Sequence, residues 1–337
     1  MIGRSAFAAL ALMAGLASAA PLAAQAIPLP ATAPAQDEPP TELSDLQTRD
    51  ARLFAAGWRL VTANAPFCGD VIPATGLLLH DAAGYGEPAQ VRGEFGLSGD
   101  IGVLAVAPGS PAALAGIAAN DTLHSLDDRV LDEAFPPSDP AWQRLVDIND
   151  TLDGAMAAGL VALEWSRPGA VPAQSLVASI PACASRFEVL ASGSRAVADG
   201  SRVLLGRDFP GFAYPEDEFG AAVAHELAHN LLRHRALLEP LGRPRALVRL
   251  TERDADRLMP WLLANAGYDP HAAARFMSRW GPRHGGGLLR SRTHDGWDER
   301  LEFIETEIAQ VERLIAEQGS ADWSRHFAPQ ATQAAAD

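Results

Sequence analysis

A single helical stretch, Asp217 to Leu238, carries the run His225-Glu226-Leu227-Ala228-His229. Residues four apart on an α-helix lie on the same face, so the two imidazoles can offer nitrogens to one Zn²⁺ at ~2.0–2.1 Å. Glu226 projects beside that point, where it can take a proton from a water molecule. The stretch is apolar nearly all round, which predicts a buried helix whose polar side chains need partners. These residues predict a metal centre with Glu226 as general base; the alternative is a helix that carries them by coincidence.

An acidic segment further along the chain offers the third ligand that a catalytic zinc site needs beside its open position. Glu252 follows His229 by 252 − 229 = 23 residues, which leaves room for a helix end, a turn and a return. Glu252 and Asp256 are four apart, so Glu252 can bind the metal while Asp256 accepts a hydrogen bond from a ligating imidazole. Asp254 is the competing ligand, on a different helical face. We therefore expect one Zn²⁺ per chain, the alternative being a solvated acidic helix start.

The composition is that of a globular protein, with 48% hydrophobic and 20% charged residues over 337 positions. The net charge of −15 speaks against nucleic acid as a partner, because such binders need a basic face, and we expect none. Arg4 and the apolar run Ala6 to Ala17 predict a cleaved signal peptide over residues 1–26, and the run is too short to span a bilayer. Two cleavage sites fit, Ala17-Ser18-Ala19 and Ala24-Gln25-Ala26. We expect a periplasmic or secreted protein with no membrane span in the mature chain.

The two cysteines, Cys68 and Cys183, predict one disulfide in an exported chain, with two buried thiols as the alternative. Residues 27–42 are rich in proline and acidic side chains, which predicts a disordered linker. Apolar residues then recur at helical spacing from Leu43 to Thr62, so residues 43–69 are expected to form an N-terminal helix of the catalytic unit that ends at the disulfide. The Ala- and Gln-rich tail, residues 328–337, is expected to be disordered.

Short β-runs split by glycine and proline predict a β-rich domain over residues 90–180. Strands are expected at 101–107, 122–126, 160–166 and 175–180, and helices at 112–115 and 139–158. The segment Val103 to Leu131, VLAVAPGSPAALAGIAANDTLHSLDDRVL, resembles PDZ domains of the bacterial kind. The resemblance implies that an extended peptide adds to a sheet edge. It implies a carboxylate-binding loop just ahead of the strand that starts at Ile101, formed by Phe95, Gly96, Leu97 and Ser98. The alternative is a module that only packs against its neighbour.

Several segments after Cys183 together resemble the gluzincin metallopeptidases of the HtpX, Oma and CAAX-prenyl-protease type. They are HELAH, ERDAD (252–256), VLASGSRAVADGSRVLLGRDF (189–209) and SRTHDGWDERL (291–301). The resemblance implies that His225, His229 and Glu252 bind zinc, that Glu226 is catalytic and that Asp256 supports a ligand. It also implies that His294 stabilises the oxyanion, and that Arg300 pairs with an active-site carboxylate.

We therefore expect an α+β fold: a mainly helical zincin-type domain with a small β-edge over residues 183–327, preceded by the PDZ-like domain. Strands are expected at 186–191 and 202–206 as a hairpin or sheet edge, and helices at 248–266, 270–280 and 298–318. The expected function is a metalloendopeptidase of exported, envelope or misfolded proteins, with substrate extended along residues 202–206. The PDZ-like domain would bind substrate or an envelope partner. The alternatives are a non-enzymatic PDZ adaptor or chaperone with a structural or vestigial zinc site, and a latent enzyme opened by a partner.

Overall fold

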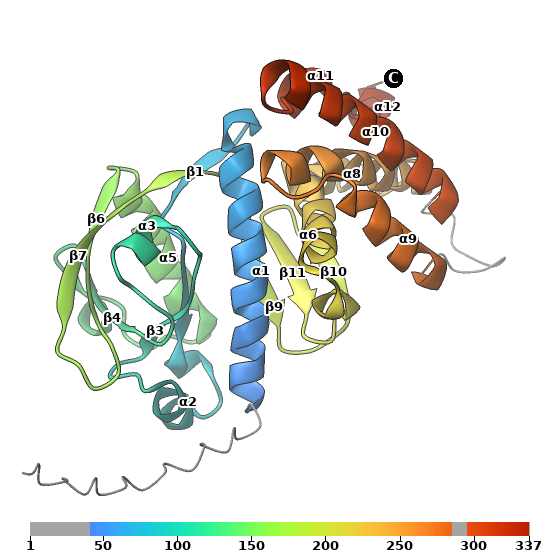
Figure 1. Ribbon diagram of the computed structural model, residues 1–337. Helices are drawn as coiled ribbons and strands as arrows, with labels where there is room; N and C mark the ends of the chain where they lie inside the picture. Colours follow the sequence, from blue (N-terminus) through green and yellow to red (C-terminus); the bar gives the residue numbers. More distant parts are fainter. Residues whose placement is uncertain (1–40, 285–294, 337) are drawn as a thin grey trace, which may run out of the picture. The chain divides into compact units, whose positions relative to one another are not determined.

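The computed structural model describes residues 41–284 and 295–336, and begins with the long helix α1 (Glu42–Asn64) (Figure 1). The Thr41 hydroxyl caps this helix by accepting a hydrogen bond from the Ser44 amide. Leu53, Leu60 and Val61 are buried on one side of the helix. A short helix, η1 (Ala65–Phe67), ends the segment at Cys68. A helix is thus present where the sequence predicts one, although it ends at Asn64, short of the expected residue 69. The expected signal peptide, and the linker up to residue 40, lie outside the described residues.

A β-rich part follows, with a six-stranded antiparallel sheet among the described residues. Its strands lie in the order β2 (Leu77–Asp81), β3 (Ile101–Val106), β4 (Thr122–Leu126), β6 (Leu160–Ser166) and β7 (Ala173–Ala178), with β5 (Arg129–Val130) paired to β4. The helices of this part are η2 (Ala82–Gly84), α2 (Pro88–Phe95), α3 (Pro111–Leu114), α4 (Leu131–Ala134) and α5 (Trp142–Met156). The core between sheet and helices includes Val103, Leu126, Ile148 and Leu163.

The start of the β-rich part differs from the expected boundary at residue 90. Gln90 lies inside α2, and the sheet already begins with β2 at Leu77. The run Leu77-Leu78-Leu79 shows no alternation between apolar and polar residues, which is why its pattern does not announce a strand. The single strand expected at 175–180 is also two elements, β7 and β8 (Ile180–Cys183).

The loop expected to bind a peptide carboxylate is packed into the β-rich part. Phe95 closes α2, and Gly96 caps that helix with a left-handed φ of 68°. Leu97 is buried, and the Ser98 amide donates to the Thr122 hydroxyl. The neighbouring strand β3 is paired on both sides, with β2 and with β4. The strand that follows this loop, β3, therefore has no free edge for an added peptide, because β2 occupies it.

A disulfide joins the two ends of the β-rich part. Cys68 and Cys183 are bonded, with a Cα–Cα distance of 5.6 Å, which confirms the expected pair. Next to the bond, β1 (Val71–Ala74) pairs antiparallel with β8, with Val71 opposite Cys183. The bond and this strand pair thus close the chain between residues 69 and 182 into one loop.

A small sheet and a set of helices form the rest of the described chain. The sheet has the order β10 (Ala196–Ala198), β11 (Arg202–Gly206) and β9 (Arg186–Leu190). Residues 186–191 and 202–206 were expected to form a hairpin or a sheet edge. They do not form a hairpin, because β9 and β11 are parallel and β10 runs antiparallel to β11; β9 is an edge strand. With only three residues, β10 is too short to show a periodic pattern. This places β11 in the middle of the sheet and β10 at its edge.

The helices after this sheet are η3 (Pro210–Ala213), α6 (Glu216–Leu231), α7 (His234–Leu238), α8 (Arg245–Asn265), α9 (Ala272–His284), α10 (Trp297–Gln318), α11 (Trp323–His326) and α12 (Gln330–Ala336). The helix expected from Asp217 to Leu238 breaks after Leu231, because Arg233 adopts a left-handed φ of 54°. The expected disordered tail instead contains α12, whose first amides, of Gln330 and Ala331, donate to Asp254.

The architecture is thus a mixed α+β fold with several sheets, as the sequence predicts at this level. The helix α1 contacts the β-rich part through β3, the strand β8 that follows it, and the small sheet through β9. Among the described helices, none has the length and apolar character needed to cross a bilayer.

Candidate metal centre

The helix α6 places two imidazoles one turn apart. Its first turn carries Glu216, Asp217 and Glu218, whose charges favour the positive end of the helix dipole. Small apolar residues let it pack tightly against α8, α9 and the small sheet, and several are fully buried: Ala221, Val223, Ala224, Leu227 and Ala228. His225 and His229 lie on the remaining polar stripe, with their Nε2 atoms 3.4 Å apart.

The helix α8 brings Glu252 to the same point. Its carboxylate oxygens lie 3.5 Å from His225 Nε2 and 3.7 Å from His229 Nε2. Two ligands that each lie ~2.1 Å from a tetrahedral ion are about 3.4 Å apart, so the three side chains fit one Zn²⁺. Among the described residues they form the group of His and carboxylate side chains whose ligand atoms lie within 4.8 Å of one another. The competing Asp254 is buried elsewhere, where it accepts from Arg257 and from backbone amides of α12.

Asp256 and Arg300 stand behind His225. Asp256 Oδ1 is 3.1 Å from His225 Nδ1, and the Arg300 guanidinium donates to both oxygens of Asp256 at 2.5 and 2.7 Å. Burial alone would raise the pKa of Asp256, but Arg300 and His225 hold that pKa below its usual value. The expected pairing of Arg300 with a carboxylate of the site is present. Asp256 is therefore an anion fixed against the outer nitrogen of His225.

Carboxylates on two sides of His225 make this point attractive to a cation. Burial lowers the pKa of His225, yet Asp256 and Glu252 outweigh it and raise that pKa to about 10. A bound dication would satisfy the same carboxylates and displace the proton. Glu226 lies beside this group, partly buried at the cavity wall. Burial raises its pKa to about 7, although the backbone amide of Ala198 opposes the change.

A third imidazole, which the sequence spacing did not indicate, lies next to the site. His234 Nδ1 lies 2.9 Å from His229 Nδ1, and burial together with His229 lowers the pKa of His234 to about 2. Five residues along an unbroken helix turn by roughly 140° from the starting face, so His234 would point away from His229. The left-handed turn at Arg233 brings it back. A non-glycine residue in that conformation gives no sequence signal, which is why this neighbour was missed.

The site opens into a cavity of about 550 Å³. One wall is formed by residues 194–198, which include the edge strand β10. The Gly206 amide donates to the Arg195 carbonyl and the Asp199 amide to the Arg202 carbonyl. By the alternation of an antiparallel pair, the backbone groups of Ala196 and Ala198 point away from β11. Aromatic side chains line another wall: Phe209, Phe276 and Trp280.

The edge that faces this cavity is therefore β10 and not residues 202–206, where the sequence placed it. His294, the expected oxyanion donor, lies outside the described residues. No family model, curated protein or solved structure matches this chain.

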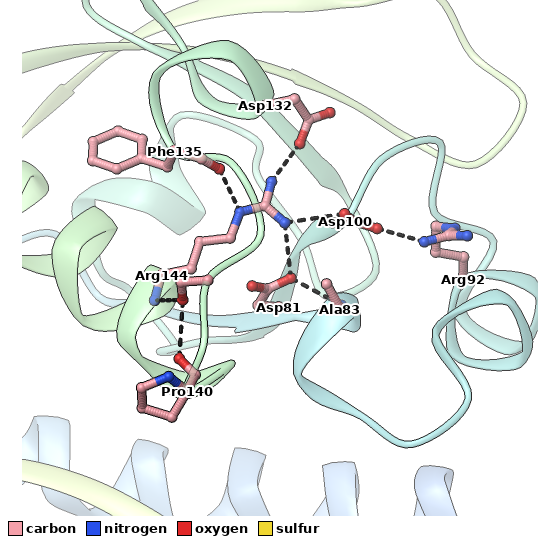
Figure 2. Close-up of polar contacts among 9 residues, drawn as sticks. Asp81, Ala83, Arg92, Asp100, Asp132, Phe135, Pro140 and Arg144 are labelled. Carbon is pink, nitrogen blue, oxygen red and sulfur yellow. Dashed lines mark hydrogen bonds and ion pairs between the residues drawn. The ribbon is translucent and has the colours of Figure 1, made fainter.

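A second cluster of charges lies in the β-rich part and contrasts with the metal centre. Arg144 of α5 is 2% exposed and donates to Asp81, Asp100 and Asp132 (Figure 2). Its Nε also donates to the carbonyl oxygen of Phe135. The three carboxylates accept hydrogen bonds from the Arg144 guanidinium, so their charges are already balanced by a cation. This cluster ties α5 to the ends of β2 and β3, which is a structural role.

Proposed function

We propose that this chain is a zinc-dependent endopeptidase of exported polypeptides. The observation that carries the proposal is the spacing of His225, His229 and Glu252 at the separations of a tetrahedral metal site, with a carboxylate beside them. Two imidazoles and one carboxylate suit zinc, and three protein ligands leave a position for substrate. A structural zinc site would be closed by four ligands, so the rival function, a non-enzymatic adaptor with a structural zinc, is less consistent with this arrangement.

The ion, when bound, supplies a Lewis acid that polarises the scissile carbonyl. Glu226 takes a proton from the attacking water and returns it to the leaving amine. Glu226 lines the same cavity as the three ligand candidates, within reach of a water molecule there. Asp256 and Arg300 hold His225 in place. The outward backbone groups of Ala196 and the carbonyl oxygen of Ala198 can pair with an extended substrate, while the Ala198 amide donates to Glu226. The aromatic wall can receive an apolar side chain.

Export is part of the proposal because the Cys68–Cys183 disulfide suits an oxidising compartment, periplasmic or extracellular. We assign no peptide-binding role to Phe95, Gly96, Leu97 and Ser98, since the strand that follows them has no open edge.

The test compares the wild-type protein with Glu226→Gln, using metal analysis and cleavage of an unfolded protein such as casein. The variant is expected to keep about one zinc per chain and to lose roughly 10²–10⁴-fold in cleavage rate. Glu252→Ala is the matched control, because it should lose the metal as well as the activity. Equal cleavage by wild type and Glu226→Gln would rule out the proposed mechanism.

A further inference from the structure

The contact between His234 and His229 is the least expected feature of the site. His234 is 2% exposed, and its Nδ1 lies 2.9 Å from Nδ1 of His229. The centroids of the two rings are 4.9 Å apart, and the ring planes meet at 76°. Its other nitrogen, Nε2, has no hydrogen-bond partner among the described residues. The ring is thus buried, and within the described ranges its polar side-chain contact is with a metal-ligand candidate.

Two nitrogens at this distance share one proton, and the position of that proton decides what His229 can do. His229 directs Nε2 toward His225 and Glu252, so this atom must carry a lone pair if it is to bind a metal. In a neutral ring the proton then sits on Nδ1 of His229 and is donated to Nδ1 of His234. With the opposite assignment, His229 Nε2 is protonated and cannot be a ligand.

We propose that His234 is a positioning residue that accepts the Nδ1 proton of His229 and so fixes the tautomer and ring orientation of this ligand. The role rests on the proposed metal centre. In this arrangement the Nδ1 atoms of the two ligating imidazoles face different groups. Nδ1 of His225 faces the Asp256 carboxylate, and Nδ1 of His229 faces the neutral imidazole of His234. Outer partners of this kind orient ligands and strengthen metal binding.

The local chain path supports this role. Helix α6 ends at Leu231, and the left-handed residue Arg233 directs the next helix so that its first residue, His234, lies against His229. Arg233 is itself paired with Asp70. An unbroken helix would carry residue 234 away from the site, so the break in α6 is what supplies the hydrogen-bond acceptor.

The experiment measures zinc affinity by competition with a chromophoric chelator for three variants. His234→Phe keeps a buried ring but has no acceptor, and we expect zinc binding to weaken about 10–100-fold. His234→Asn can place its amide oxygen near the position of Nδ1, and we expect an affinity within about threefold of wild type, since the acceptor is retained. His80→Leu is the matched control, because His80 is 3% exposed, also has an Nε2 without a described partner, and lies in β2.

Thermal unfolding of the zinc-free proteins separates loss of the hydrogen bond from loss of the fold. If His234→Phe does not fold, His234→Leu takes its place. The inference is overturned if the folded Phe or Leu variant binds zinc as tightly as wild type, or if Asn loses as much affinity as Phe. Absence of zinc binding by the wild-type protein would instead overturn the proposed function. Weaker zinc binding by His80→Leu would also count against a specific role of His234.

Discussion

At the scale of single residues, the site combines a cation-attracting centre with a rigid outer layer. Glu252 completes the group formed by His225 and His229, while Asp256 is fully buried between His225 and Arg300. An anion at that depth is stable only with its cationic partner in place. Asp256 therefore serves two interactions at once, and changing it affects both metal binding and folding.

Asp256→Asn changes both quantities, and a second change at Arg300 separates them. The amide oxygen can still accept from His225, but the charge is lost, so zinc affinity is expected to fall about 10–100-fold. Arg300 loses its bidentate partner, and a buried charge without its counterpart costs about 3–5 kcal/mol. Chelator competition and urea unfolding measure the two quantities. The double variant Asp256→Asn/Arg300→Met should regain part of the unfolding free energy without regaining zinc affinity; full recovery of both would contradict this account.

At the scale of elements, α1 is joined to the small sheet by a buried carboxyl. Asp50 of α1 is 7% exposed, and its Oδ1 accepts from the Val189 amide of β9 at 3.0 Å. Burial raises the pKa of Asp50 to about 7, with Glu188 adding to the shift and the Val189 hydrogen bond opposing it. The folded protein therefore favours the protonated form of this carboxyl.

This shift predicts how stability depends on pH. The unfolded pKa is 3.8 and the folded pKa about 7, so the contribution of Asp50 is fully present below pH 3.8 and is lost as the pH rises to about 7. The loss is roughly 1.4 kcal/mol per pH unit within that window. Asp50→Asn keeps the acceptor for Val189 but cannot ionise. Urea unfolding at several pH values should show wild type losing stability relative to the variant between pH 4 and 7, and parallel curves there would contradict it.

The same scale explains what the sequence could and could not predict. Helical spacing fixes which side chains share a face of a helix. The sequence therefore predicted two pairs of neighbours that are four residues apart, His225 with His229 and Glu252 with Asp256. His234 was missed because its position depends on a left-handed turn at a non-glycine residue.

The errors in the sheets have a related cause. The edge strand β10 and the parallel pairing of β9 with β11 depend on contacts between segments, which the pattern of one short strand does not encode. The strand β2, which lies beside β3, was also not predicted, because its residues show no alternating pattern.

At the scale of the whole molecule, covalent and backbone links tie the β-rich part to the rest of the chain. The disulfide closes a separation of 115 residues, and β1 and β8 pair beside it. Both ends of the β-rich part are therefore fixed at one place, next to the end of α1. The metal-ligand candidates belong to α6 and α8, outside this loop.

This arrangement predicts that losing the disulfide weakens the fold more than the metal centre. A closed loop of this length restricts the unfolded chain, and the chain-entropy model gives about 4–5 kcal/mol for the bond. The double variant Cys68→Ser/Cys183→Ser should unfold at a lower urea concentration, while at low temperature it keeps the zinc affinity of the wild type. Wild-type protein unfolded in a strong reductant is the control and should match the variant. An unchanged unfolding midpoint would mean that the β1–β8 pair and the packing of α1 hold the base of this loop without the bond.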